Sequence, residues 1–114
     1  MFDLDNVVAE DVQENDLEEV VMGLIINSGQ ARSLAYTALK QAKQGDFETA
    51  KTTMEQSRVA LSEAHRVQTQ LIESDEGEGR IKVSLVLVHA QDHLMTSMLA
   101  RELVAELIEL HEKV

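Results

Sequence analysis

This sequence of 114 residues lacks several residue types, and each absence excludes something. It contains no cysteine, which excludes disulfides and thiolate chemistry and fits a reducing compartment. It contains no proline, so no residue forces a helix to break. Aromatic residues make up only 3% of the chain, which leaves no platform for stacking bases or sugar rings. These absences favour long helices and argue against direct carbohydrate binding.

Basic residues are also scarce, because 10 lysines and arginines face 21 acidic residues, giving a formal net charge of −11. Such a charge repels nucleic acid and anionic membrane surfaces, so we expect partners with basic patches. The amino terminus lacks the basic start and apolar run of a signal peptide. The apolar run from Val83 to Val88 is too short to span a bilayer. We therefore expect a cytoplasmic protein with no direct membrane insertion.

The chain is long enough for one domain, which we place at residues 16–114 behind a flexible acidic tail at residues 1–15. The first helix is expected to begin near Asn15 or Asp16. Asn15 is a good N-cap residue, and Glu18 follows three residues later as in a capping box. An amphipathic pattern then continues for more than twenty residues, which is typical of a bundle helix.

Two short breaks divide the domain into three helices, so the predicted fold class is all-α, an antiparallel three-helix bundle. Gly45 suits the left-handed position after a helix, and Asp46 suits the cap of the next one. The second break is the acidic, glycine-bearing segment at residues 74–80, after which the third helix is expected from about Lys82. In the first two helices, helical spacing predicts a core of Leu17, Val20, Leu24, Ala31, Leu34, Ala38, Ala42, Phe47, Ala50, Met54, Ser57, Leu61, Ala64, Gln68 and Leu71.

Two glycines, Gly23 and Gly29, fall inside the first helix, where each costs about 1 kcal/mol relative to alanine. This cost indicates either close packing of helices or proximity to a site. The polar residues around Gly29, together with Arg32, could line a polar pocket. A close helix crossing with exposed polar side chains is the favoured interpretation.

The residues best suited to bind a ligand or to react lie in the third helix. Two apolar turns lead into His89, Asp92 and His93, whose i, i+3 and i+4 spacing places them on one helix face. A helix that is apolar on nearly every side must be covered on more than one side, which predicts contact with neighbouring chains. Its later part has coiled-coil character, with glutamates between Leu99, Leu103, Leu107 and Leu110.

The residue types leave three interpretations of this block open. Two imidazoles and a carboxylate could hold a divalent metal, although Ala90 stands where a zinc protease needs its glutamate. One histidine could instead accept and pass on a phosphoryl group. The histidines could also be ordinary surface or interface residues, but imidazole is costly to bury in an aliphatic run unless it is hydrogen-bonded.

Two stretches resemble a known family: VLVHAQDHLMTSMLA at residues 86–100 and VVMGLIINSGQARSLAYTALKQAKQGDF at residues 20–47. They are similar to the IIA components of the lactose and cellobiose family of the bacterial phosphotransferase system (PTS). The resemblance covers the chain from about Leu17 to Val114. It implies a symmetric homotrimer, a nine-helix bundle with the third helices at its centre.

The resemblance also implies a function and roles for individual residues. His89 matches the phosphorylated histidine, which accepts a phosphoryl group from the histidine phosphocarrier protein HPr. The group then passes to a cysteine of the cognate IIB protein, which phosphorylates sugar entering through the membrane component IIC. Asp92 matches a carboxylate at the trimer axis that binds a divalent cation, Mg²⁺ being expected, while Gln91 and His93 match residues beside the phosphohistidine. The implied sugars are disaccharides of the N,N′-diacetylchitobiose or cellobiose type.

Two further expectations concern the relay itself. Phosphoryl transfer depends on positioning and charge stabilisation, and we expect an apolar collar to shield the intermediate from water. That collar is Leu85, Val86, Val88 and Leu94. No arginine lies in the histidine block, so we expect no strong clamp on the phosphoryl group.

Two alternatives to the IIA interpretation remain. The first is a histidine phosphotransfer domain of two-component signalling, although such domains usually follow the histidine with a small residue and a lysine-glycine pair. Here Ala90, Gln91, Asp92 and His93 follow instead. The second is a non-catalytic helical oligomer that holds a structural metal.

Overall fold

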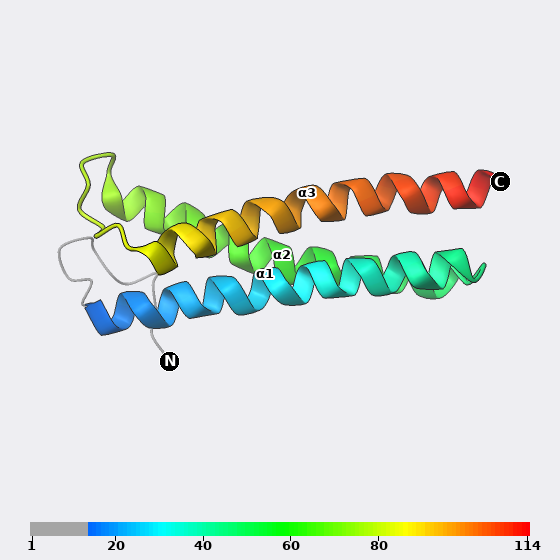
Figure 1. Cartoon of the computed structure of the whole chain (residues 1–114), viewed down its shortest axis with the longest axis horizontal. Coiled ribbons are helices and arrows are strands. Elements are labelled where there is room, and N and C mark those ends of the chain that lie inside the picture. The colour runs from blue at the N-terminus through cyan, green and yellow to red at the C-terminus, as the bar shows by residue number, and fades with distance from the viewer. Residues whose placement is uncertain (1–13) are drawn as a thin grey trace.

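Three long helices lie side by side in the computed structural model, which describes residues 14–114 (Figure 1). They are α1 (Glu14–Lys43), α2 (Phe47–Asp75) and α3 (Leu85–Lys113). Helices α1 and α3 run in the same direction and pack against each other, and α2 runs in the opposite direction behind them in this view. The predicted all-α three-helix protomer is therefore confirmed.

Helix α1 begins earlier than the sequence indicates. Its first residue is Glu14, so Asn15 lies inside the helix and is not its N-cap. The prediction of Asn15 as the cap is wrong, since the helical hydrogen bonding extends one residue further back. The rest of the expected acidic tail, residues 1–13, lies outside the described residues.

The turn between α1 and α2 forms as its residues predict. Gly45 has a φ of 83°, a left-handed conformation in which glycine carries no side-chain penalty. Its N–H donates to the Ala42 carbonyl at 2.9 Å, and the N–H of Asp46 donates to the Gln41 carbonyl at 2.9 Å. The Asp46 carboxylate then accepts from the N–H of Thr49 at 3.3 Å, which caps α2.

The connection between α2 and α3 is longer than expected, because α3 begins at Leu85 and not near Lys82. The Asp75 carboxylate accepts from the N–H groups of Ile81 at 2.8 Å and Gly79 at 3.2 Å. These bonds hold the backbone up to Ile81 in a loop. Ser84 then caps α3, since its hydroxyl accepts from the N–H of Leu87 at 3.2 Å.

The core has two hydrophobic clusters, one toward each end of the bundle. The first is near the α2–α3 loop and consists of Val20, Val21, Leu24, Ala64, Leu71, Ile81, Leu87, Ala90 and Leu94. The second is near the α1–α2 turn and consists of Ala35, Ala38, Ala42, Ala50, Val104 and Ile108. Between them lies a serine layer, defined as the fully buried Ser28, Ser57 and Ser97. Within it, the Ser57 hydroxyl donates to the Ala31 carbonyl at 2.6 Å.

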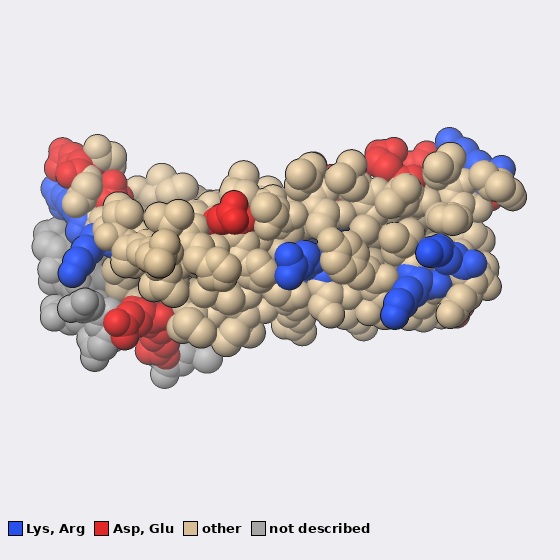
Figure 2. All heavy atoms as spheres, viewed as in Figure 1, with Lys and Arg blue, Asp and Glu red and all other residues tan. Residues whose placement is uncertain are grey.

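A large apolar surface remains exposed on α3. Leu85 keeps 87% of its surface exposed, and Met95, Leu99 and Leu103 keep more than half. The face over α1 and α3 is correspondingly poor in charged groups along its middle (Figure 2). Among the described residues, no helix is long and apolar enough to cross a membrane. The exposed apolar side chains agree with the expectation that α3 needs further cover.

Replacing Asp75 with asparagine should destabilise the α2–α3 loop in a pH-dependent way. The N–H groups of Ile81 and Gly79 hold the pKa of Asp75 below its ordinary value of 3.8. A depressed carboxylate pKa stabilises the fold above the ordinary value, and this stabilisation is lost as pH falls through the folded-state pKa. The difference in unfolding free energy between wild type and Asp75→Asn should therefore be full at neutral pH and shrink below pH 4.

Chemical denaturation at neutral and acid pH measures this difference. Glu78→Gln is the matched control, because it removes a carboxylate of the same loop that forms an exposed ion pair with Arg80. An equal, pH-independent loss in both variants would contradict the role given to Asp75.

Candidate functional site

Helix α3 places two imidazoles one above the other, one turn apart. The Ser84 cap fixes the start of the helix, and His89 follows in the second turn with its side chain exposed. His93 is half-buried. The two rings stack with centroids 5.8 Å apart and planes inclined by 12°. The i, i+4 spacing thus produces the shared face that the sequence predicts.

His93 also lies against α1. Its Nε2 atom is 3.3 Å from the position that a Cβ on Gly29 would occupy. Burial lowers the pKa of His93 from its ordinary value, the electrostatic effects of Arg32 and the neighbouring His89 lower it further, and Asp92 acts in the opposite sense. His93 therefore favours the neutral imidazole, which offers one hydrogen-bond donor and one acceptor.

Gln91 is held by a residue of α2. The side-chain amide of Gln68 donates to the Oε1 atom of Gln91 at 2.5 Å, and its nitrogen lies 3.8 Å from the sulfur of Met95. Because the carbonyl oxygen of Gln91 already accepts this bond, its own NH₂ group remains a donor. This bond holds Gln91 on the α2 side of α3, and no hydrogen bond within residues 14–114 joins it to His89 or His93.

Asp92 stands on the exposed apolar side of α3. It is exposed, as are Val88, Met95 and Leu99, which lie one or two turns away on that side. Its carboxylate makes no hydrogen bond or ion pair within the described part of the chain. A carboxylate oxygen is a ligand that hard divalent cations prefer. One carboxylate does not complete a cation site, so further carboxylates from outside the protomer would be needed. Within residues 14–114 of one protomer, no three histidine or acidic side chains converge to hold a metal.

The expected apolar collar is only partly formed by one protomer. Leu85, Val86 and Val88 are exposed near His89, as a collar on the surface requires. Leu94 is fully buried in the protomer core, so its assignment to the collar is wrong. It lies on nearly the opposite side of α3 from Asp92 and belongs to the core cluster formed with residues of α1 and α2.

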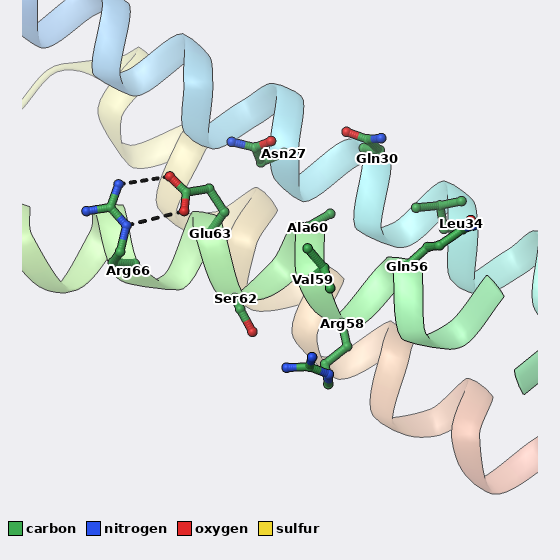
Figure 3. Close-up of a pocket in the computed structure, with 10 residues that line it drawn as sticks. All are labelled: Asn27, Gln30, Leu34, Gln56, Arg58, Val59, Ala60, Ser62, Glu63 and Arg66. Carbon is green, nitrogen blue, oxygen red and sulfur yellow. Dashed lines mark hydrogen bonds and ion pairs between the residues drawn. The ribbon is translucent and has the colours of Figure 1, made fainter. Parts of the chain in front are cut away.

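A broad groove of about 840 Å³ lies elsewhere, between α1 and α2 (Figure 3). Gln30 and Leu34 border it from α1, Val59 borders it from α2, and Glu63 and Arg66 form an ion pair at its edge. None of the histidine-block residues lines this groove. Although the groove is large, its lining residues are not the ones expected to react, so we do not assign the functional site to it.

The sequence predicts Gln68 as a core residue and does not indicate its contact with Gln91, although a glutamine at an otherwise apolar position is a signal for a polar contact. The sequence offers Arg32 as a possible pocket residue beside Gly29, and the structure brings its charge close enough to act on His93. The absence of arginine from the histidine block therefore does not describe the whole neighbourhood of the histidines. The site described by one protomer is an exposed imidazole stacked on a half-buried one, with the guanidinium of Arg32 acting on the second ring, and a positive charge there is suited to a transient anion.

The sequence matches a known protein family and known members of it. The family model for the lactose/cellobiose-specific IIA subunit of the PTS matches residues 19–112. The chain is 76% identical over 113 residues to the PTS system N,N′-diacetylchitobiose-specific EIIA component of Escherichia coli strain K12, covering 99% of this chain and 97% of that protein.

Solved structures agree with this match. The IIA(Chitobiose) chain in the solution structures of the IIA(Chitobiose)–HPr complex from Escherichia coli has a TM-score of 0.76 and 79% identity, covering 90% of this chain and 97% of that one. The PTS cellobiose-specific enzyme IIA from Bacillus anthracis has a TM-score of 0.80 and 42% identity, covering 90% and 92%. The chain therefore belongs to the lactose/cellobiose-specific IIA subunits of the bacterial phosphotransferase system.

Proposed function

We propose that this IIA subunit carries a phosphoryl group on His89, between HPr and the cysteine of a IIB protein. The observation that carries the proposal is the exposed His89 ring stacked on the half-buried His93. A partner protein can reach the first ring, while the second is held beside it by the protomer. The related Escherichia coli protein, solved as a complex with HPr, supports the same donor here.

The transfer consists of two in-line displacements. A ring nitrogen of His89 attacks the phosphorus of the phosphohistidine on HPr, a new P–N bond forms, and the P–N bond to HPr breaks. In the second step the thiolate of IIB attacks the same phosphorus, and the His89 ring leaves. Gln91 and His93 are proposed to hydrogen-bond the phosphoryl oxygens, and the charge of Arg32 on the α1 side favours the anion.

The exposed apolar side of α3 supports assembly as a homotrimer. Its large side chains follow one another at helical spacing along the whole helix: Leu85, Val88, Met95, Leu99, Leu103, Leu107 and Leu110. Three such helices packed together bury these side chains and produce a nine-helix bundle. Helices from sister subunits would then complete the collar around His89.

Asp92 is the proposed ligand of a divalent cation, Mg²⁺ by its preference for oxygen. Its carboxylate interrupts the apolar series of α3, so three copies would meet where the third helices pack. The cation would neutralise their mutual repulsion, and the role proposed for it is structural. The transfer step involves only the protein's own side chains and the phosphoryl group.

The sugar proposed for the system is N,N′-diacetylchitobiose, because the relative at 76% identity is named for it. This chain would act in the cytoplasm and pass phosphate to IIB, which serves the membrane component IIC. The family match argues against a two-component phosphotransfer domain. A purely metal-holding oligomer is not favoured either, since it leaves the stacked histidines without a role.

His89→Gln should abolish phosphorylation, because the attacking nitrogen is lost. The wild-type protein incubated with phosphoenolpyruvate, enzyme I and HPr should gain one phosphoryl group per chain by mass spectrometry, and this label should be acid-labile and base-stable. His65→Gln is the matched control, since His65 is an exposed histidine on α2. Wild-type protein that takes no label at His89 would contradict the proposal.

Asp92→Leu should keep or increase the stability of the trimer, because it replaces three repelling carboxylates by aliphatic contacts. Light scattering should give a trimer mass, and Mg²⁺ should raise the melting temperature of the wild type but not of the variant. Glu73→Leu, an exposed substitution on α2, is the control for loss of negative charge. Dissociation of Asp92→Leu into monomers would rule out the axial placement.

Arg32→Gln should raise the pKa of His93 toward its ordinary value, since one of the charges that lower it disappears. The return should be incomplete because burial of the ring remains. Because its folded-state pKa is lowered, the contribution of His93 to stability is full above the ordinary histidine pKa and is lost as pH falls through the folded-state pKa. Titration of the His93 ring by NMR measures the change, and Arg58→Gln, whose charge pairs with Glu55 on α2, should leave it unaffected.

A further inference from the structure

Two glycines in the interior of α1 have different surroundings. Both weaken the helix relative to alanine. A Cβ placed on Gly23 meets no atom of residues 14–114 within 4 Å, so none of these residues requires glycine there. A Cβ placed on Gly29 meets the Nε2 atom of His93 at 3.3 Å, which is closer than an ordinary van der Waals contact. Gly29 therefore leaves room for one particular side-chain atom.

The His93 ring occupies a slot with two walls. One wall is the backbone of α1 at Gly29, and the other is the His89 ring, whose centroid lies 5.8 Å from that of His93. The backbone of His93 is fixed within α3, where the carbonyls of Asp92 and His93 accept from the Thr96 hydroxyl at 2.9 and 3.2 Å. A methyl group on Gly29 would therefore move the ring away from α1 or force α1 and α3 apart.

We propose that Gly29 is a positioning residue for phosphoryl transfer, because its missing side chain lets the His93 imidazole lie against α1 at a set distance from His89. This inference rests on the proposed role of His89. It adds a residue of another helix that touches neither the phosphoryl group nor the reacting nitrogen. Gly29 acts only through His93.

The test compares Gly29→Ala with Gly23→Ala, which make the same chemical change in the same helix. Transfer from phosphorylated HPr should be about tenfold slower in Gly29→Ala, since displacement of a positioned group by a fraction of an ångström slows a transfer step. Gly23→Ala should react at the wild-type rate. The NMR signals and pKa of the His93 ring should change in Gly29→Ala alone. Arg32, His89 and Asp92 are the charged or titratable groups that act on this ring within the described residues.

A double-variant cycle with His93→Ala separates positioning from general damage to the fold. Removing the imidazole frees the space, so Gly29→Ala should cause no further loss of rate in that background.

Two results would overturn the inference: a wild-type rate with unchanged His93 signals in Gly29→Ala, or an equal rate loss with and without His93. Failure of the proposed function looks different. In that case wild-type protein takes no phosphate on His89, while the NMR comparison of the two glycine variants still reports whether Gly29 positions the ring.

Discussion

The close approach of α1 to α3 determines where the histidines lie. Small residues are fully buried on both helices, among them Ser28 and Ala31 on α1 and Ala90 and Ser97 on α3. Small side chains let two backbones come near enough for one helix to form a wall beside a side chain of the other. The position of His93, and through it the surroundings of His89, therefore depends on how these two helices pack.

Most of the fold could be predicted from local signals. Gly45 and Asp46 end one helix and begin the next through their own backbone and side-chain geometry. The start of α3 could not be predicted in the same way, because the apolar residues after Arg80 fit a helical repeat. There, the Asp75 carboxylate binds the N–H of Ile81, six residues away, and this bond competes with helix formation.

The site was predictable only within one helix. The spacing of His89 and His93 fixes their common face, since both belong to α3. The contacts of Gly29 with His93 and of Gln68 with Gln91 depend on how each helix is rotated about its axis. A helical repeat gives the buried side of a helix but not the partner of each side chain, which is also why Leu94 was placed wrongly. The sequence offers Arg32 as a possible pocket residue, but its proximity to His93 follows from the packing of α1 against α3.

The serine layer divides the bundle into two halves that bury different amounts of apolar side-chain area. The half that holds the histidines is built around leucine, valine and isoleucine, whereas the other half depends largely on alanine, whose methyl groups bury little area. Hydrogen exchange in a single protomer should therefore begin with fraying near the α1–α2 hairpin. Such fraying can occur while the leucine-rich half keeps its helices in register, so the stacked rings of His89 and His93 keep their positions when the distant end of the bundle opens.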